Sequence, residues 1–173
     1  DAPPLVNRHE QGNAWFVDSV RIVPDADAEI TAVSVFDPAS VAVIDARFNG
    51  ALEGLELTPD TSARISLTEY RANYLKYASS AVTERLAVFS EVYYDKGWQA
   101  YIDGKPAEHI RADYLLRAMR VPAGSHIIEF RFHPKSYFLG EKISLASSLL
   151  MILMVLGTGY WEWRGRRDEG QGT

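Results

Sequence analysis

The strongest constraint on the fold is a segment of 19 residues without a charged side chain, residues 143–161 (ISLASSLLMILMVLGTGYW). As a helix rising 1.5 Å per residue it is about 28 Å long, close to the thickness of the hydrocarbon core of a bilayer. Tyr160, Trp161 and Trp163 cluster at one end, as aromatic side chains do at the boundary with lipid headgroups. A buried helix of a soluble core would also be apolar, but the aromatic cluster favours a transmembrane helix.

Basic residues next to this segment predict its orientation. Three of them lie within six residues of Trp161: Arg164, Arg166 and Arg167. Short basic segments stay in the cytoplasm, which places residues 1–140 outside it. Arg131, Lys135 and Lys142 flank the other end, but they carry less weight because they adjoin a large domain. We therefore expect an extracytoplasmic domain (1–140), a transmembrane helix (141–163) and a cytoplasmic basic and polar tail (164–173).

The charge and the cysteine content exclude several functions. The net charge of -5 lies wholly in residues 1–140, because the charged residues from Glu141 onward cancel. Such an acidic domain binds nucleic acid poorly, so no nucleic-acid partner is expected. The absence of cysteine excludes disulfide bonds, thiolate metal sites and a cysteine nucleophile. The sequence begins at Asp1 with no leader-like segment, so either a leader has been removed or the sequence is a fragment.

Short segments rich in β-branched and aromatic residues recur through the first 140 residues, which is typical of an all-β domain. We expect a mainly β fold, an antiparallel β-sandwich of jelly-roll-like form, with one short accessory helix and then the single C-terminal transmembrane helix. The accessory helix should follow the capping residue Asp25 and end before Asp37-Pro38. The expected strands are residues 14–23 (one strand or a pair), 41–46, 64–70, 74–78, 86–94, 98–102, 116–121 and 126–132.

Two patterns of side chains refine the positions of two strands. Ile128, Phe130 and Phe132 alternate with charged residues, which indicates a strand with one buried face. Residues 86–89 are apolar on both faces and indicate a central strand.

Two turn signals predict hairpins. Asp103-Gly104 tolerates positive φ at both positions, so a hairpin should join residues 98–102 to residues 105–110. Residues 121–124 (VPAG) place a proline and a glycine where a tight turn needs them. They predict a second hairpin.

Five aromatic residues form the candidate site for carbohydrate: Tyr93, Tyr94, Trp98, Tyr101 and Tyr114. Sugars stack on exposed aromatic rings and form hydrogen bonds with neighbouring carboxylates. The same residue types fill the cores of β-sandwiches, and Trp98 is expected to be mainly a core anchor. Exposure of these rings in an open groove would favour glycan binding, whereas burial would favour a structural role.

No catalytic or metal-binding residue is expected. Glu91, Asp95, Asp103 and Asp113 are candidates for a glycosidase carboxylate pair, but a turn explains Asp103 and solvated faces explain the others. The histidines have no i,i+2 or i,i+4 spacing for a local metal site: His9, His109, His126 and His133. The sequence contains no G-x-S-x-G, phosphate-binding glycine-rich loop or H-E-x-x-H motif. No cofactor is expected.

Three segments resemble the C-terminal region of the YfhO family of bacterial membrane proteins. They are residues 89–105 (FSEVYYDKGWQAYIDGK), residues 110–118 (IRADYLLRA) and residues 121–134 (VPAGSHIIEFRFHP). Residues 12–17 (GNAWFV) are similar to an upstream strand of the family. The resemblance touches most of residues 12–160, although loosely similar G-W-x-x-x-x-D-G hairpins occur in other sugar-transferase ectodomains.

The resemblance implies a multispanning protein of the polyprenyl-phosphate-sugar glycosyltransferase type in the bacterial cell membrane. Its catalytic acids would lie in an early extracytoplasmic loop between N-terminal membrane helices, which this chain does not contain. The chain would then be a non-catalytic C-terminal domain near those helices, and it would help to hold an envelope glycan or a lipid-linked sugar. The alternative is a structural or interaction module of a membrane protein that binds no sugar.

Overall fold

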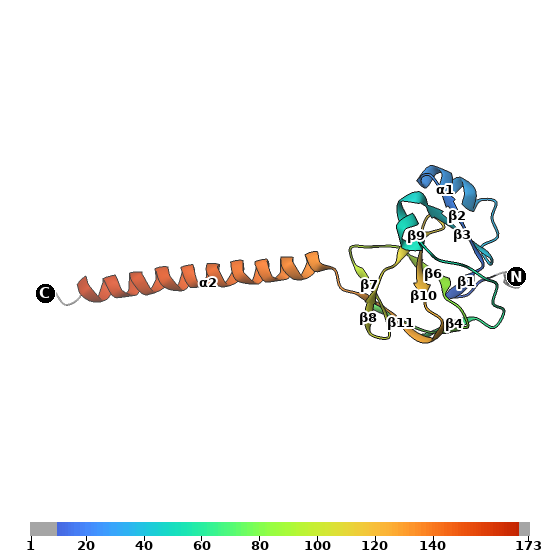
Figure 1. Cartoon of the computed structure of the whole chain (residues 1–173). Coiled ribbons are helices and arrows are strands. Elements are labelled where there is room, and N and C mark those ends of the chain that lie inside the picture. Colours follow the sequence, from blue (N-terminus) through green and yellow to red (C-terminus); the bar gives the residue numbers. More distant parts are fainter. Residues whose placement is uncertain (1–9, 170–173) are drawn as a thin grey trace, which may run out of the picture. The chain divides into compact units, whose positions relative to one another are not determined.

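The computed structural model describes residues 10–169, which belong to two compact units, Asp1–His133 and Pro134–Thr173 (Figure 1). The described part of the first unit consists of strands and two short helical segments, and that of the second is a long helix. The predictions made for His9 and for residues 170–173 of the tail lie outside the described residues.

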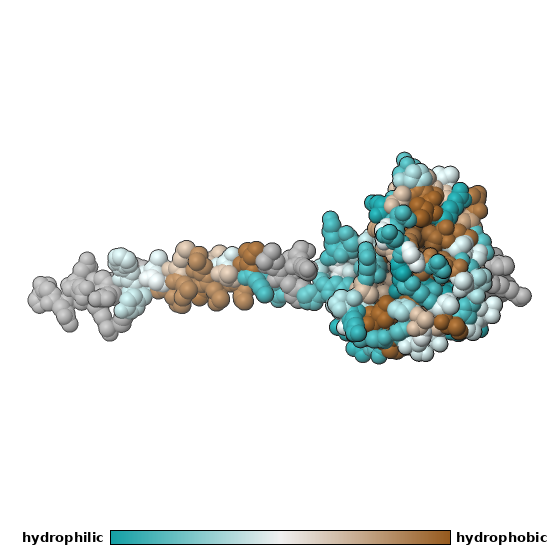
Figure 2. Space-filling model, in the orientation of Figure 1, coloured by the Kyte–Doolittle hydropathy of each residue, from teal (hydrophilic) through white to brown (hydrophobic). Residues whose placement is uncertain are grey.

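The second unit is the helix α2 (Lys135–Glu169). Its segment Gly140–Trp161 is long and apolar enough to cross a membrane, and every side chain in it is exposed. This segment contains the apolar band of the helix in Figure 2. Ser147, Ser148 and Thr158 donate their hydroxyls to backbone carbonyls about one turn earlier, which satisfies these polar groups inside the helix. The predicted apolar helix is confirmed, and it extends further at both ends.

Two antiparallel sheets form the sandwich of the first unit. The four-stranded sheet has the order β1 (Ala14–Val17), β6 (Arg85–Val92), β10 (Leu116–Val121) and β9 (Ile110–Ala112). The five-stranded sheet has the order β4 (Arg64–Arg71), β5 (Tyr74–Ala81), β11 (Gly124–Phe132), β7 (Trp98–Ile102) and β8 (Lys105–Ala107). Buried side chains of both sheets pack between them, and Tyr77, Phe89 and Phe130 meet edge to face. The predicted antiparallel sandwich is confirmed.

A third, smaller layer covers the other face of the four-stranded sheet. It consists of the parallel pair β2 (Ser19–Val23) and β3 (Val41–Asp45), the helix α1 (Ala26–Val33) and the 3₁₀ segment η1 (Ala46–Leu52). Asp25 caps α1 by accepting a hydrogen bond from the backbone N–H of Ala28, as expected. The helix supplies the crossover that a parallel pair requires. The predicted segment 14–23 is therefore two strands, which belong to different sheets.

The third layer explains the apolar pattern of residues 86–89. All four side chains are fully buried, because β6 contacts the five-stranded sheet on one face and the third layer on the other. The second core joins β6 to β3 and η1, with members Val17, Ala42, Ile44, Leu52, Leu86, Val88, Ile110, Ala112 and Ala118. The prediction of a central strand is confirmed.

The first predicted hairpin is confirmed. Asp103 and Gly104 form the two-residue loop between β7 and β8, with φ of 50° and 77°. The Asp103 carboxylate also accepts a hydrogen bond from the backbone N–H of Ile127 (2.9 Å). The predicted partner strand 105–110 is divided, because β8 ends at Ala107 and the chain then enters the other sheet as β9.

The second predicted hairpin is wrong. Residues 121–124 join β10 of the four-stranded sheet to β11 of the five-stranded sheet, so the two strands do not pair. Val121 and Ile128 both belong to the core between the sheets, and the chain has to cross that core to bury both. Proline and glycine favour the bend of this crossing for the same reasons that they favour a hairpin turn.

We expect Gly104→Val to destabilise the sandwich by about 1–2 kcal/mol, because a β-branched residue rarely adopts positive φ. Nothing lies within 4 Å of the place that a Cβ would take at Gly104, so the cost is in the backbone. Gly104→Asn is the matched control and should cost less, since asparagine tolerates the left-handed region. Denaturant unfolding of the detergent-solubilised chain measures both variants, and equal stability of the two would contradict the mechanism.

Candidate functional site

The two candidate aromatic residues of β7 lie on opposite faces of its sheet. Trp98, at the start of β7, packs against the core between the sheets. Tyr101 is on the opposite, outer face of the same strand, where its hydroxyl donates to the Gln99 side chain (2.8 Å). The Arg131 guanidinium lies 4.5 Å from the centre of the Tyr101 ring. Tyr101 is therefore separated from Trp98 by the sheet itself.

Tyr93 and Trp98 are half-buried and make ring contacts. Tyr93 lies 5.8 Å from Phe48 and 5.4 Å from His109 between ring centres. Trp98 lies 5.2 Å from Phe132. These contacts are those of packing anchors.

Tyr94 and Tyr114 are the most exposed of the five, at 48% and 39%. They lie on neighbouring connections, since the backbone N–H of Tyr93 donates to the carbonyl of Leu115 (2.8 Å). Tyr114 has a φ of 67°, and Tyr94 is the second residue of the loop that leads from β6 to β7. Four of the five predicted contact residues, all except Tyr101, lie at this end of the sandwich. Their contact with a glycan stays a prediction.

Position 97 of this loop has no room for a side chain. A Cβ at Gly97 would lie 2.8 Å from the Tyr94 ring and would also overlap the Phe132 ring. The backbone N–H of Trp98 donates to the Tyr94 carbonyl (3.2 Å), and the N–H of His133 donates to the Gly97 carbonyl (2.8 Å). The loop is thereby held against the last residues of the first unit.

A buried arginine lies behind Trp98. The Arg117 side chain is 1% exposed, and its guanidinium lies 4.3 Å from the Trp98 ring and 5.1 Å from the Phe130 ring. Its Nε donates to the Val92 carbonyl (2.8 Å), while its Nη1 has no hydrogen-bond partner. Burial lowers the pKa of this guanidinium. Sequence analysis missed Arg117, although its signal is an arginine in the inward-facing series with Met119 and Val121.

Two further buried polar atoms without a hydrogen-bond partner are the Tyr77 hydroxyl and His109 Nε2. Burial, with the Arg117 cation as a second cause, lowers the pKa of His109 to about 4. Burial also raises the pKa of Tyr77. Near neutral pH both side chains are uncharged, and Arg117 is the cation of this region.

A second polar cluster joins the third layer to the sandwich. Glu29 of α1 is fully buried and forms an ion pair with Arg111 of β9 (2.5 Å), which also contacts Asp45 (3.5 Å). Glu29 accepts a further hydrogen bond from the Tyr114 backbone N–H (2.9 Å). Asp113 exchanges two hydrogen bonds of 2.8 Å with the backbone of Val43.

Asp113 is a buried carboxyl group of this cluster. Burial raises its pKa to about 6, with the neighbouring Glu29 charge as a smaller cause, and its Oδ2 has no hydrogen-bond partner. Asp113 and Tyr114 both have positive φ, 51° and 67°, which costs backbone energy that the surrounding bonds offset.

The other predicted candidates lie apart. Asp103 stabilises its hairpin and contacts His126 Nδ1 (2.6 Å), and the hydrogen bond to Asp103 raises the pKa of His126. Glu91 is half-buried and Asp95 is exposed on the 93–97 loop. Among residues 10–169, no group of three or more His, Asp or Glu side chains could hold a metal ion.

A cleft of about 320 Å³ lies elsewhere, beside β1 and β4. Its charged side chains already have partners. Asp18 pairs with Arg85 (2.5 Å), the Asp60 carboxylate accepts bonds from Ser62 and Val82, and Arg64 donates to the Thr61 carbonyl. They stabilise the cleft's own loops.

The family model described as "Bacterial membrane protein YfhO" matches residues 57–144, from just before β4 to the beginning of the apolar segment of α2. The protein named "Uncharacterized protein YfhO" of Bacillus subtilis (strain 168) is 32% identical over 62 residues. That alignment covers 36% of this chain and 7% of the Bacillus protein, so the chain matches a small part of a much longer relative. No solved structure matches the chain. The upstream similarity of residues 12–17 lies outside the family match.

Asp113→Asn should change the pH dependence of stability. The raised pKa means that the folded state holds this proton more tightly, so the contribution is complete below about pH 4 and is lost as pH rises to about 6. Relative to the variant, the parent should lose on the order of 2–3 kcal/mol over that range. Unfolding measured at several pH values gives this difference, and a difference that stays constant from pH 4 to 6 would contradict the assignment.

Trp98→Ala should lower the stability of the sandwich by about 3 kcal/mol, because it removes packing on Phe132 and uncovers the buried Arg117. Tyr101→Ala, on the outer face of the same strand, is the control and should cost less. Melting temperatures of both variants test this. An unchanged melting temperature for Trp98→Ala would show that Trp98 is not an anchor.

Proposed function

Because the chain belongs to the YfhO family of bacterial membrane proteins, we propose that it is the C-terminal extracytoplasmic part of a multispanning glycosyltransferase. The parent protein would take its sugar from a polyprenyl-phosphate carrier. The sandwich is its accessory domain, non-catalytic by itself, and helps to hold an envelope glycan or the lipid-linked sugar. The observation that carries the proposal is a family match that runs through the sandwich into α2, residues 57–144.

The proposed side of the membrane follows from charge. Arg164, Arg166 and Arg167 follow the apolar segment closely, and a short basic tail stays in the cytoplasm. The sandwich then lies outside, where envelope glycans are assembled. The N-terminal membrane helices of the parent protein are the expected neighbours of α2.

The proposed sugar contacts are Tyr94 and Tyr114. Their rings are the most exposed of the five candidates, and Asp95 and Lys96 supply exposed polar groups beside Tyr94. Trp98 and Tyr93 are half-buried and pack on other rings, Phe132 and His109 respectively. These buried contacts also favour the second candidate function, a structural or interaction module without sugar binding.

Binding measurements separate the two functions. The chain in nanodiscs is titrated with N-acetylglucosamine oligomers and with glycerol phosphate polymers, followed by tryptophan fluorescence and calorimetry. Tyr94→Ala and Tyr114→Ala should weaken binding without a change in melting temperature. Tyr70→Ala, at an exposed tyrosine outside the predicted site, is the matched control. Binding that is absent, or equally affected by all three changes, would favour the structural module.

A single introduced cysteine tests on which side of the membrane the sandwich lies. The sequence contains none, so Val82→Cys, at a side chain 75% exposed, gives a single reporter in the sandwich. A membrane-impermeant maleimide should label this cysteine in cells whose outer layers have been removed but whose cell membrane is intact. Labelling only after lysis would place the sandwich in the cytoplasm.

A further inference from the structure

Four large apolar side chains are exposed at one end of the sandwich. They are Val92 at 53%, Tyr94 at 48%, Tyr114 at 39% and Leu115 at 51%. Val92 ends β6, Tyr94 lies in the loop after β6, and Tyr114 and Leu115 lie in the turn before β10. The hydrogen bond from the Tyr93 N–H to the Leu115 carbonyl joins this loop to this turn. We call these four residues the apolar rim. A contiguous exposed apolar group of this kind indicates a contact surface.

The chain itself ties the apolar rim to the start of the apolar helix. The Gly97 carbonyl, in the same loop as Tyr94, accepts a hydrogen bond from His133, and α2 begins two residues later at Lys135. The candidate span begins at Gly140 and its charge-free part at Ile143. The five to eight helical residues from Lys135 rise about 7.5–12 Å, so α2 begins within or just outside the roughly 5–8 Å of headgroup region on each side of a bilayer. This rise is measured along the helix axis from Lys135.

From this geometry we propose that the apolar rim lies in the lipid headgroup layer, where Val92, Tyr94, Tyr114 and Leu115 contact lipid. Tyrosine is enriched at that depth because its ring is apolar and its hydroxyl is wet. The sandwich is thereby fixed to the membrane surface by a second contact besides α2. This contact needs no sugar, so it stands apart from the proposed function. Tyr94 and Tyr114 can serve both only if the sugar that they bind is itself the headgroup of a lipid.

The charges around the apolar rim indicate how lipid is recognised. Asp95 and Lys96 are adjacent and opposite in sign. Arg111, whose guanidinium lies 5.3 Å from the centre of the Tyr114 ring, is already paired with Glu29. The apolar rim itself therefore has little attraction to anionic headgroups, and its own contact with lipid is apolar and insensitive to salt.

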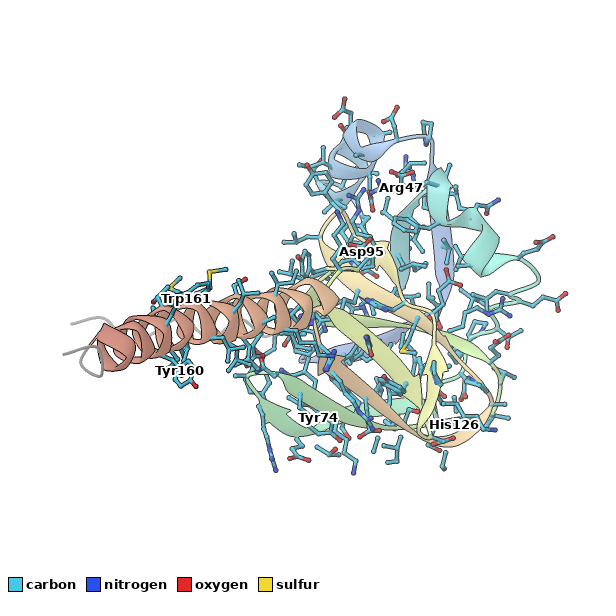
Figure 3. All side chains as sticks on the ribbon, turned by 90° about the vertical axis from the view of Figure 1, so that its left-hand side faces the viewer. Arg47, Tyr74, Asp95, His126, Tyr160 and Trp161 are labelled. Carbon is cyan, nitrogen blue, oxygen red and sulfur yellow. The ribbon has the colours of Figure 1, made fainter. Side chains whose placement is uncertain are left out.

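Site-directed spin labels test the contact in the whole chain, reconstituted through α2 into vesicles of phosphatidylcholine and phosphatidylglycerol. Leu115→Cys carries one nitroxide, and Val92→Cys is a second reporter that guards against a local effect of one substitution. Val82→Cys is the control, because it follows Ala81, which pairs with Gly124 at the other end of the five-stranded sheet. Tyr74 and His126, labelled in Figure 3, mark the two ends of that sheet. Unchanged melting temperatures establish that the labelled chains are folded.

The expected result is that labels at residues 115 and 92 collide more often with oxygen, and several-fold less often with a water-soluble nickel chelate, than the label at residue 82. High salt should leave this pattern unchanged. Equal exposure of all three labels to the chelate would overturn the proposal. Protection from both reagents at residues 115 and 92 would also overturn it, because it would indicate contact with a second copy of the chain. A pattern that disappears in high salt would overturn the apolar mechanism.

Discussion

The burial of the four-stranded sheet on both faces is the constraint on which the rest of the first unit depends. A sandwich of two sheets would leave one face of β6 in water, and Leu86 and Val88 could not be fully buried there. The chain meets this requirement with a third layer inserted between β1 and β4, made of α1, the parallel pair and η1. The Glu29–Arg111 pair and the bonds between Asp113 and Val43 then attach this layer to β9. Removal of one charged partner would leave the other buried and unpaired, which is costly.

Local patterns in the sequence predicted most elements of the fold. The apolar run of α2, the alternation around Phe130 and the turn at Asp103-Gly104 each depend on neighbours a few residues away, and each is confirmed. The sequence could not show which strands share a sheet. Residues 121–124 have the composition of a hairpin but cross between sheets, since long-range burial of Val121 and Ile128 outweighs local turn preference. The parallel pairing of β2 with β3 is likewise set by contacts that composition does not encode.

The candidate site was predicted only as a set of residue types. Tyrosine and tryptophan are equally suited to a core and to a sugar-binding surface. The sheet separates Tyr101 from Trp98, although the two residues are only three positions apart in the sequence. Arg117 was missed and His109 was judged an isolated histidine, because a single arginine or histidine in such a segment is ordinarily solvated. Their importance depends on burial beside Phe130, which no local pattern reveals.

The position of β11 determines when this domain can be completed during synthesis. β11 is the last strand of the sandwich and lies between β5 and β7, so the five-stranded sheet has a gap at its middle until residues 124–132 have left the ribosome. Until then β5 and β7 each have an unpaired edge, on which a strand of another molecule can pair. Because β11 is followed by α2 alone in the described part of the chain, these edges stay unpaired until the sandwich is almost wholly synthesised.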